Sequence, residues 1–144
     1  MASLQEHLKS LDQSVRLKAA LAAGTYPEAD YIPVLIHQCA VETDFFVRDT
    51  LSWALMRHDR ETVVASLMPE LKSPIPQARS QALHTLSKIG DKANYSLITN
   101  EHFFDEVDSV ASTAWRAASV LVPEDKKSDL VKILVTQLGR GDGD

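Results

Sequence analysis

The sequence predicts one all-α domain built from repeated pairs of helices. Its 144 residues suit a single domain, and 44% are hydrophobic, 24% charged and only 6% aromatic, a composition typical of a soluble helical protein. Four similar segments recur along the chain, each around a small or apolar anchor residue at positions 15, 47, 78 and 110. The spacings of 32, 31 and 32 residues indicate a repeat architecture.

The four repeated segments are expected to form helices over about 13–23, 45–58, 76–89 and 108–121. Small or apolar residues recur at the spacing that places them on one helix face. In the second segment this face consists of Val47, Leu51, Ala54 and Leu55. Asp12 and Asp44 are placed to cap the first two helices, and Gly24 and Gly90 to end the first and the third.

A partner helix is expected before each of the later anchor helices, over 31–41, 62–71 and 94–104. A short helix over about 3–9 opens the chain, and one over 127–138 closes it. Pro27 and Pro123 are each followed by glutamate and lie three periods apart, where they suit a first helical turn. No alternating pattern indicates a strand.

These helix pairs resemble HEAT repeats, in which the first helix carries a proline and the second opens with an apolar-Arg pair. The best matches are IPVLIHQCAVETDFFVRDTLSWAL and SPIPQARSQALHTLSKIGD. The resemblance implies a right-handed α-solenoid of about four and a half HEAT-like helix-pair repeats. The repeats would cover about 1–24, 25–58, 59–90 and 91–122, with a half repeat over 123–138 and a flexible tail over 139–144.

The arginine of the HEAT pattern is usually tied to a neighbouring turn, and Arg16, Arg48 and Arg79 are expected to have this structural role. The fourth repeat has Ala111 at that position. Asp105 fits the acidic position of the family pattern, whereas the other three repeats depart from aspartate there, with Ser10, Glu42 and Ser73. The resemblance therefore implies helical stacking, without a continuous Asp-Arg ladder.

The charge distribution favours an acidic partner on the second-helix side, which is the concave side in the family. The net charge is −5, which excludes a strongly cationic nucleic-acid protein as the first interpretation. The four anchor helices nevertheless hold seven basic and only two acidic residues. An acidic outer surface and a neutral-to-basic inner one suit an acidic or extended segment of a partner protein.

The candidate binding residues lie at anchor-helix positions that face away from the core. Trp53, His84 and Arg116 occupy equivalent positions in three successive repeats and are expected to form a row. Tryptophan and arginine are frequent interface anchors. The remaining candidates are Arg48, Asp49, Met56, Ser80, Ser87 and Trp115. The alternative interpretation buries both tryptophans between neighbouring helices.

No catalytic, metal or cofactor site is predicted. His37 and Cys39 are too close in sequence to share a helix face, and no histidine pair has the spacing of a helical metal site. Cys39 is expected in the core, and as the only cysteine it fits a reducing, cytoplasmic setting. His84 lies near Ser80 and Ser87, but no carboxylate is evident to orient it.

A non-enzymatic adaptor or scaffold that binds another protein is the favoured function. The alternative is nucleic-acid binding, or a HEAT-like DNA glycosylase, for which Trp53, Trp115, Asp49 and Arg116 supply suitable residue types. The local motif of those enzymes does not match this sequence, so nucleic acid is the less favoured partner. No membrane partner is expected, because the longest uncharged stretch, 31–41, is too short to span a bilayer. The uncovered end of the terminal half repeat offers a surface for self-association.

Overall fold

The computed structural model describes residues 3–138, and every regular element within that range is a helix. The α-helices are α1 (Leu4–Leu8), α2 (Gln13–Thr25), α3 (Tyr31–Val41), α4 (Phe45–Met56), α5 (Arg60–Leu67), α6 (Pro76–Ile89), α7 (Asn100–Phe103), α8 (Asp108–Leu121) and α9 (Lys127–Val135). Three 3-10 helices are η1 (Pro69–Lys72), η2 (Lys92–Leu97) and η3 (Glu124–Lys126). The predicted all-α class is confirmed, and the predicted tail over 139–144 lies outside the described residues.

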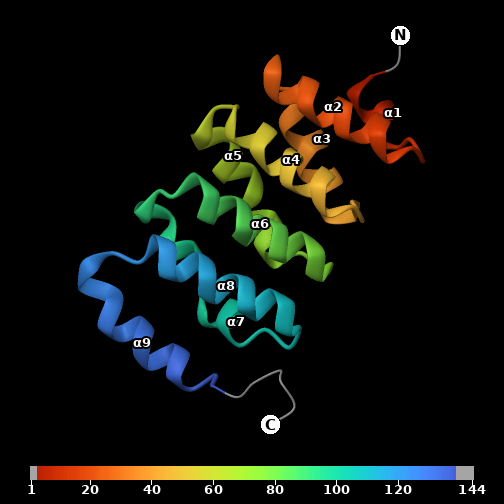
Figure 1. Ribbon diagram of the computed structural model, residues 1–144. Coiled ribbons are helices and arrows are strands. Elements are labelled where there is room, and N and C mark those ends of the chain that lie inside the picture. The colour runs from red at the N-terminus through yellow and green to blue at the C-terminus, as the bar shows by residue number, and fades with distance from the viewer. Residues whose placement is uncertain (1–2, 139–144) are drawn as a thin grey trace.

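The four predicted anchor helices are α2, α4, α6 and α8, and they lie side by side in chain order (Figure 1). Their bounds agree with the prediction to within two residues at each end. α2 packs along α4 and α6 packs along α8. α1, α3 and α5 form a second row behind them, in which α3 contacts both α1 and α5.

The helix ends follow the predicted caps in three of four cases. Asp12 accepts the backbone N–H of Ser14 at 2.9 Å, and Asp44 accepts that of Val47 at 2.9 Å. Gly90 ends α6 with a φ of 72°, a left-handed conformation that glycine adopts without a steric penalty. The prediction for Gly24 was wrong, because α2 continues to Thr25 and Gly24 is buried inside it.

Two predicted partner helices are interrupted. The expected helix over 94–104 is replaced by η2 and α7, because Asp91 caps η2 while Thr99 and His102 form a capping box that starts a new helix. The expected helix over 62–71 divides into α5 and η1 before Pro69, which has no N–H to donate. Pro27 lies in the connector before α3 instead of in its first turn.

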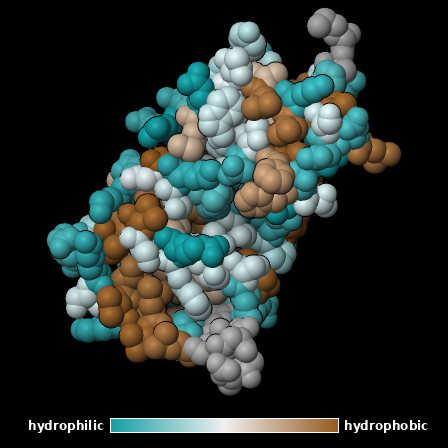
Figure 2. All heavy atoms as spheres, in the orientation of Figure 1, coloured by the Kyte–Doolittle hydropathy of each residue, from teal (hydrophilic) through white to brown (hydrophobic). Residues whose placement is uncertain are grey.

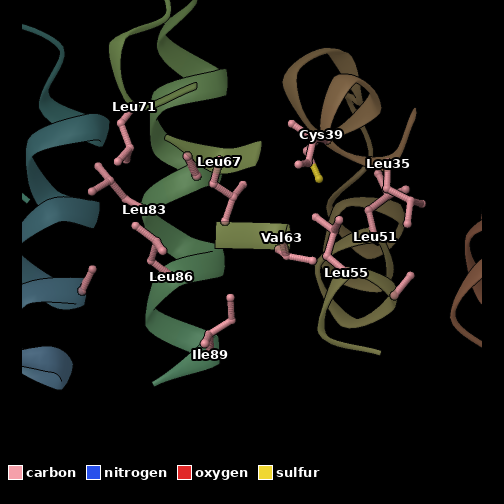
Figure 3. Packing of buried hydrophobic residues seen from close by; sticks show 14 of the residues in the cluster. Leu35, Cys39, Leu51, Leu55, Val63, Leu67, Leu71, Leu83, Leu86 and Ile89 are labelled. Atoms are coloured by element: carbon pink, nitrogen blue, oxygen red, sulfur yellow. The ribbon is translucent and has the colours of Figure 1, made fainter. Parts of the chain in front are cut away.

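A continuous apolar core lies between the two rows of helices. The predicted face of α4 is confirmed, since all four of its residues are buried. Val63 and Leu67 of α5 lie between α4 and α6, and Val63 points toward Leu55 (Figure 3). These side chains therefore connect the second repeat to the third.

The last helix leaves apolar side chains uncovered. Leu130 of α9 is buried against α8, while Val131 and Val135 are exposed, as is Val120 near the end of α8. Figure 2 shows hydrophobic surface gathered along α9 and the carboxyl-terminal end of α8. Within residues 3–138 no helix has both the length and the apolar content needed to cross a membrane.

Candidate functional site

The turns that precede the four anchor helices, α2, α4, α6 and α8, share the same local hydrogen bond. In each turn, the side chain of the residue three positions before the helix accepts a hydrogen bond from the backbone N–H two residues further along the chain. The four acceptor side chains are Ser10, Glu42, Ser73 and Asp105, at 3.1, 3.0, 3.1 and 2.9 Å. These four residues are therefore structurally equivalent, which extends the sequence repeat to atomic detail.

The three repeated arginines also share one contact. Arg16, Arg48 and Arg79 each donate through Nη1 to the backbone carbonyl six residues earlier, at 2.9, 3.0 and 2.8 Å. The expectation that these arginines are tied to turns is confirmed. Each guanidinium thereby fixes the turn that leads into its own helix.

Two of these arginines also pair with the next repeat. Arg16 donates through Nε and Nη2 to the two carboxylate oxygens of Glu42, at 2.9 and 3.0 Å. Arg79 binds Asp105 in the same way, at 2.9 and 3.1 Å. Glu42 thus replaces the aspartate of the family pattern, and its departure from that pattern does not remove the ion pair.

The corresponding ion pair is missing between the second and third repeats. The equivalent partner of Arg48 is Ser73, which has no carboxylate. Within residues 3–138, the hydrogen bond to the Glu42 carbonyl is the only one that Arg48 makes, so Nε and Nη2 have no acceptor. The ladder is therefore broken at one defined position.

The junction between α4 and α6, which we call the seam, also differs in its packing. The backbones of α4 and α6 come close at far fewer positions than those of α2 and α4 or of α6 and α8. Gln77 holds the seam instead, because its Nε2 donates to the carbonyls of Cys39 and Glu42 at 2.9 and 2.7 Å. The hydrogen bonds of Gln77, the buried side chains of α5 and a more exposed ion pair between Lys88 and Asp49 thus take the place of the buried arginine–carboxylate pair.

A polar groove of about 210 Å³ lies along the seam and extends to α8. Five of the predicted site residues line it together: Arg48, Asp49, Ser80, His84 and Arg116. The other lining residues are Phe45, Gln81 and Thr113. Residues from three successive repeats therefore share one depression on the surface formed by α4, α6 and α8.

The groove carries an excess of positive charge. Asp49 is paired with Lys88, whose Nζ lies 2.8 Å from Oδ1. Arg116 is exposed, and its one hydrogen bond within the described chain is a long one, 3.4 Å to Thr113 Oγ1. Arg48 and Arg116 consequently face the groove without a carboxylate partner.

His84 is expected to be neutral at pH 7. Burial lowers the pKa of its imidazole, the nearby cations Lys88 and Arg116 lower it further, and Asp49 offsets only part of this effect. The Oε1 atom of Gln81 is buried without a hydrogen-bond partner in the described structure. The groove thus offers polar but uncharged groups beside its two free arginines.

The other four predicted site residues lie outside the groove. Trp115 donates its Nε1–H to the Phe103 carbonyl at 3.0 Å and packs against the core, as the alternative interpretation expected. Trp53 is 38% exposed and lies over Gly24 of α2. Met56 packs partly against the core, and Ser87 is half-buried. The expected row of Trp53, His84 and Arg116 therefore does not line one groove.

The position of Trp53 explains the glycine at position 24. A β-carbon there would overlap the indole ring. We expect Gly24→Ala to displace the Trp53 side chain toward solvent and shift its fluorescence to longer wavelength. Stability should change by less than about 1 kcal/mol, because the better helix propensity of alanine offsets the lost packing.

The measurement requires a Trp115→Phe background, in which Trp53 is the sole remaining tryptophan. Ala22→Ser, at an exposed neighbouring position of α2, is the control and should leave the spectrum unchanged. An unshifted spectrum in Gly24→Ala would contradict the close contact between Gly24 and Trp53.

The aromatic end of the groove was not predicted from the sequence. Phe45 is 63% exposed and Phe46 is 67% exposed, and their rings meet edge to face with centroids 5.6 Å apart. Neither ring belongs to the core face of α4. The signal was present in the sequence, since two adjacent phenylalanines cannot both lie on one narrow helix face.

Two further features of the described residues, Cys39 and a larger cavity, contain ionisable groups. Cys39 is buried, and burial raises the pKa of its thiol to about 12, so it is not a nucleophile near neutral pH. No group of three metal-binding side chains occurs in residues 3–138. A larger cavity, of 740 Å³, is lined by Arg79 and Asp105, but these two already neutralise one another.

No family model matches the chain, and no curated protein matches it.

Proposed function

We propose that this chain is a HEAT-like α-solenoid that acts as a non-enzymatic adaptor, binding an acidic, extended segment of another protein. The binding surface is the groove formed by α4, α6 and α8. The observation that carries the proposal is the presence of two arginines without carboxylate partners, Arg48 and Arg116, in one groove beside the exposed rings of Phe45 and Phe46.

The solenoid part of the proposal is supported by the repeated contacts. The turn hydrogen bond recurs four times, and the arginine-to-turn bond recurs three times at the same sequence interval. Recurrence of this kind is expected where each repeat packs mainly on its neighbours. A surface shared by successive repeats suits an extended ligand, which makes contact with each repeat in turn.

The chemistry of the groove supports an acidic peptide with an apolar residue. Arginine pairs with carboxylates through charge-assisted hydrogen bonds, and exposed aromatic rings bury apolar side chains. The glycosylase alternative has less support, because Trp115 is engaged by the Phe103 carbonyl and Asp49 by Lys88. The cytoplasm remains the proposed location.

The test compares wild-type protein with Phe45→Ala/Arg116→Ala, using fluorescence anisotropy. The probes are a set of labelled 12-residue peptides of varied acidic and apolar content, together with duplex DNA of 20 base pairs. Acidic peptides that contain an aromatic residue should bind the wild type, and the double variant should bind them about tenfold more weakly, the effect of losing one charged contact. Matching circular dichroism and melting must show that both proteins are folded.

The matched control is Lys18→Ala/Leu21→Ala, which removes one exposed cation and one exposed apolar side chain from α2, away from the groove. It should bind the peptides like the wild type. If Phe45→Ala/Arg116→Ala bound the peptides with the same affinity as the wild type, the adaptor proposal would be wrong. Tighter binding of the DNA, with a steep salt dependence, would replace it with the nucleic-acid alternative.

A further inference from the structure

We infer that the groove contains a specific carboxylate subsite, in which Nε and Nη2 of Arg48 receive an aspartate or glutamate side chain of the bound segment. The inference rests on the proposed function for the source of that carboxylate. It adds the residue that selects the ligand and the geometry of the contact. The bound carboxylate would contact the guanidinium of Arg48 through the same two nitrogens that Glu42 and Asp105 contact on Arg16 and Arg79.

The molecule itself supplies two examples of the contact. Arg16 and Arg79 use Nη1 to hold their own turn and present Nε and Nη2 to a carboxylate, with all four charged contacts between 2.9 and 3.1 Å. Arg48 makes the same Nη1 bond to its turn at 3.0 Å. Its guanidinium is therefore anchored by the same atom, which favours the same two-pronged contact.

The chain does not supply the third carboxylate. Ser73 keeps the turn hydrogen bond, to the backbone N–H of Ile75 at 3.1 Å, but its hydroxyl cannot neutralise a guanidinium. Gln77 links the two repeats instead, and it does so by donating to backbone carbonyls. These hydrogen bonds do not neutralise the positive charge of Arg48. Among the described residues, no carboxylate forms an ion pair with Arg48, and the nearest one in the groove, Asp49, is paired with Lys88.

Arg48 forms part of the wall of the groove. Arg48 is half-buried yet lines the groove, where α4 and α6 approach each other at few positions. A partly desolvated arginine gains more from a carboxylate than a fully exposed one does, because solvent screens the interaction less. Arg116 in the same groove favours a ligand with a second negative charge. The bound segment would also bridge α4 to α6, so ligand binding should raise the melting temperature.

The experiment observes the arginine side chains directly, through their Nε–Hε resonances in two-dimensional ¹⁵N NMR spectra of the whole chain. The probe is N-acetylated hexaglutamate, and hexaglutamine is its uncharged control. Hexaglutamate should shift the Arg48 resonance and leave those of Arg16 and Arg79 in place. Its affinity should fall about tenfold in Arg48→Gln, as expected for the loss of a charged hydrogen bond.

A second pair of variants fills the subsite from within. Ser73→Asp should move the Arg48 resonance toward those of Arg16 and Arg79 and weaken hexaglutamate binding. Ser73→Asn, whose side chain has the shape of aspartate without its charge, should do neither. This pair separates occupation of Arg48 from any effect of losing the Ser73 hydroxyl. It does not require removal of the arginine.

Four results would overturn the inference. The first is equal affinity of wild type and Arg48→Gln for hexaglutamate. If Phe45→Ala/Arg116→Ala still lost binding in that case, the adaptor proposal would stand without the Arg48 subsite. No shift of Arg48 at saturating hexaglutamate would have the same meaning. An equal shift with inorganic phosphate at the same concentration would contradict selection of a carboxylate. If neither hexaglutamate nor any acidic 12-residue peptide bound the wild type, both proposals would fail.

Discussion

Arg16→Met is expected to reduce the free energy of unfolding by about 3 kcal/mol, the lower end of the range for removing one partner of a buried ion pair. Glu42 is only 2% exposed, and its carboxylate accepts two hydrogen bonds from Arg16. Without them it keeps only the Gln38 amide and the Asp44 backbone N–H, both uncharged donors. The variant therefore leaves a buried charge uncompensated, at a position where protonation or local opening must relieve it.

Arg48→Met is the matched control, since it removes an arginine from the equivalent position of the next repeat. It should cost about 1 kcal/mol, the value of a single hydrogen bond, because Arg48 has no carboxylate partner in the described chain. The Glu42 carbonyl that loses Arg48 keeps its bond from Gln77 at 2.7 Å. Urea unfolding followed by circular dichroism measures both values. Equal losses in the two variants would contradict a structural difference between the two arginines.

The anchor helices could be predicted because several local signals agreed. The repeat period and the apolar face placed α2, α4, α6 and α8, and the aspartate caps agreed with them at the starts of α2 and α4. The segment over 94–104 has the composition of a helix but contains a Thr99–His102 capping box, and the local hydrogen bonds at Asp91 and Thr99 prevailed over helix propensity. Gly24 was misread because its role is tertiary: it provides space for Trp53, a residue 29 positions away.

The candidate site was predictable only to the level of helix register. Register placed Arg48, Asp49, Ser80, His84 and Arg116 on one side of three helices, and the structure brings them into one groove. It could not show that the Trp115 indole turns back to the Phe103 carbonyl in α7, the other helix of the same repeat. Nor could it show that α4 and α6 separate at the seam, since that follows from the packing of α3 and α5 against α6.

Acid is expected to destabilise the protein through the two buried arginine–carboxylate ion pairs between repeats. Burial alone would raise the pKa of the Glu42 carboxyl, but the hydrogen bonds from Arg16, Asp44 and Gln38 outweigh it and lower the pKa below its usual value. The pKa of Asp105 is lowered in the same way, chiefly by Arg79. The unfolded chain therefore binds protons first as the pH falls. The stability from these pairs is complete above the unfolded pKa values, about 4.3 for glutamate and 3.9 for aspartate, and is lost as the pH falls through the lower, folded values.

The double variant Glu42→Gln/Asp105→Asn should separate this contribution from the others. It should be less stable than wild type at pH 7 but lose less stability between about pH 5 and pH 3. The melting temperatures of the two proteins should therefore converge as the pH falls. Asp59 and Glu124, exposed carboxyls whose pKa values are also lowered, remain in both proteins and cancel from the difference. The same holds for His84, whose lowered pKa causes an earlier loss of stability below about pH 6.5. A constant difference in melting temperature between the two proteins across the acid range would show that these two ion pairs do not control acid unfolding.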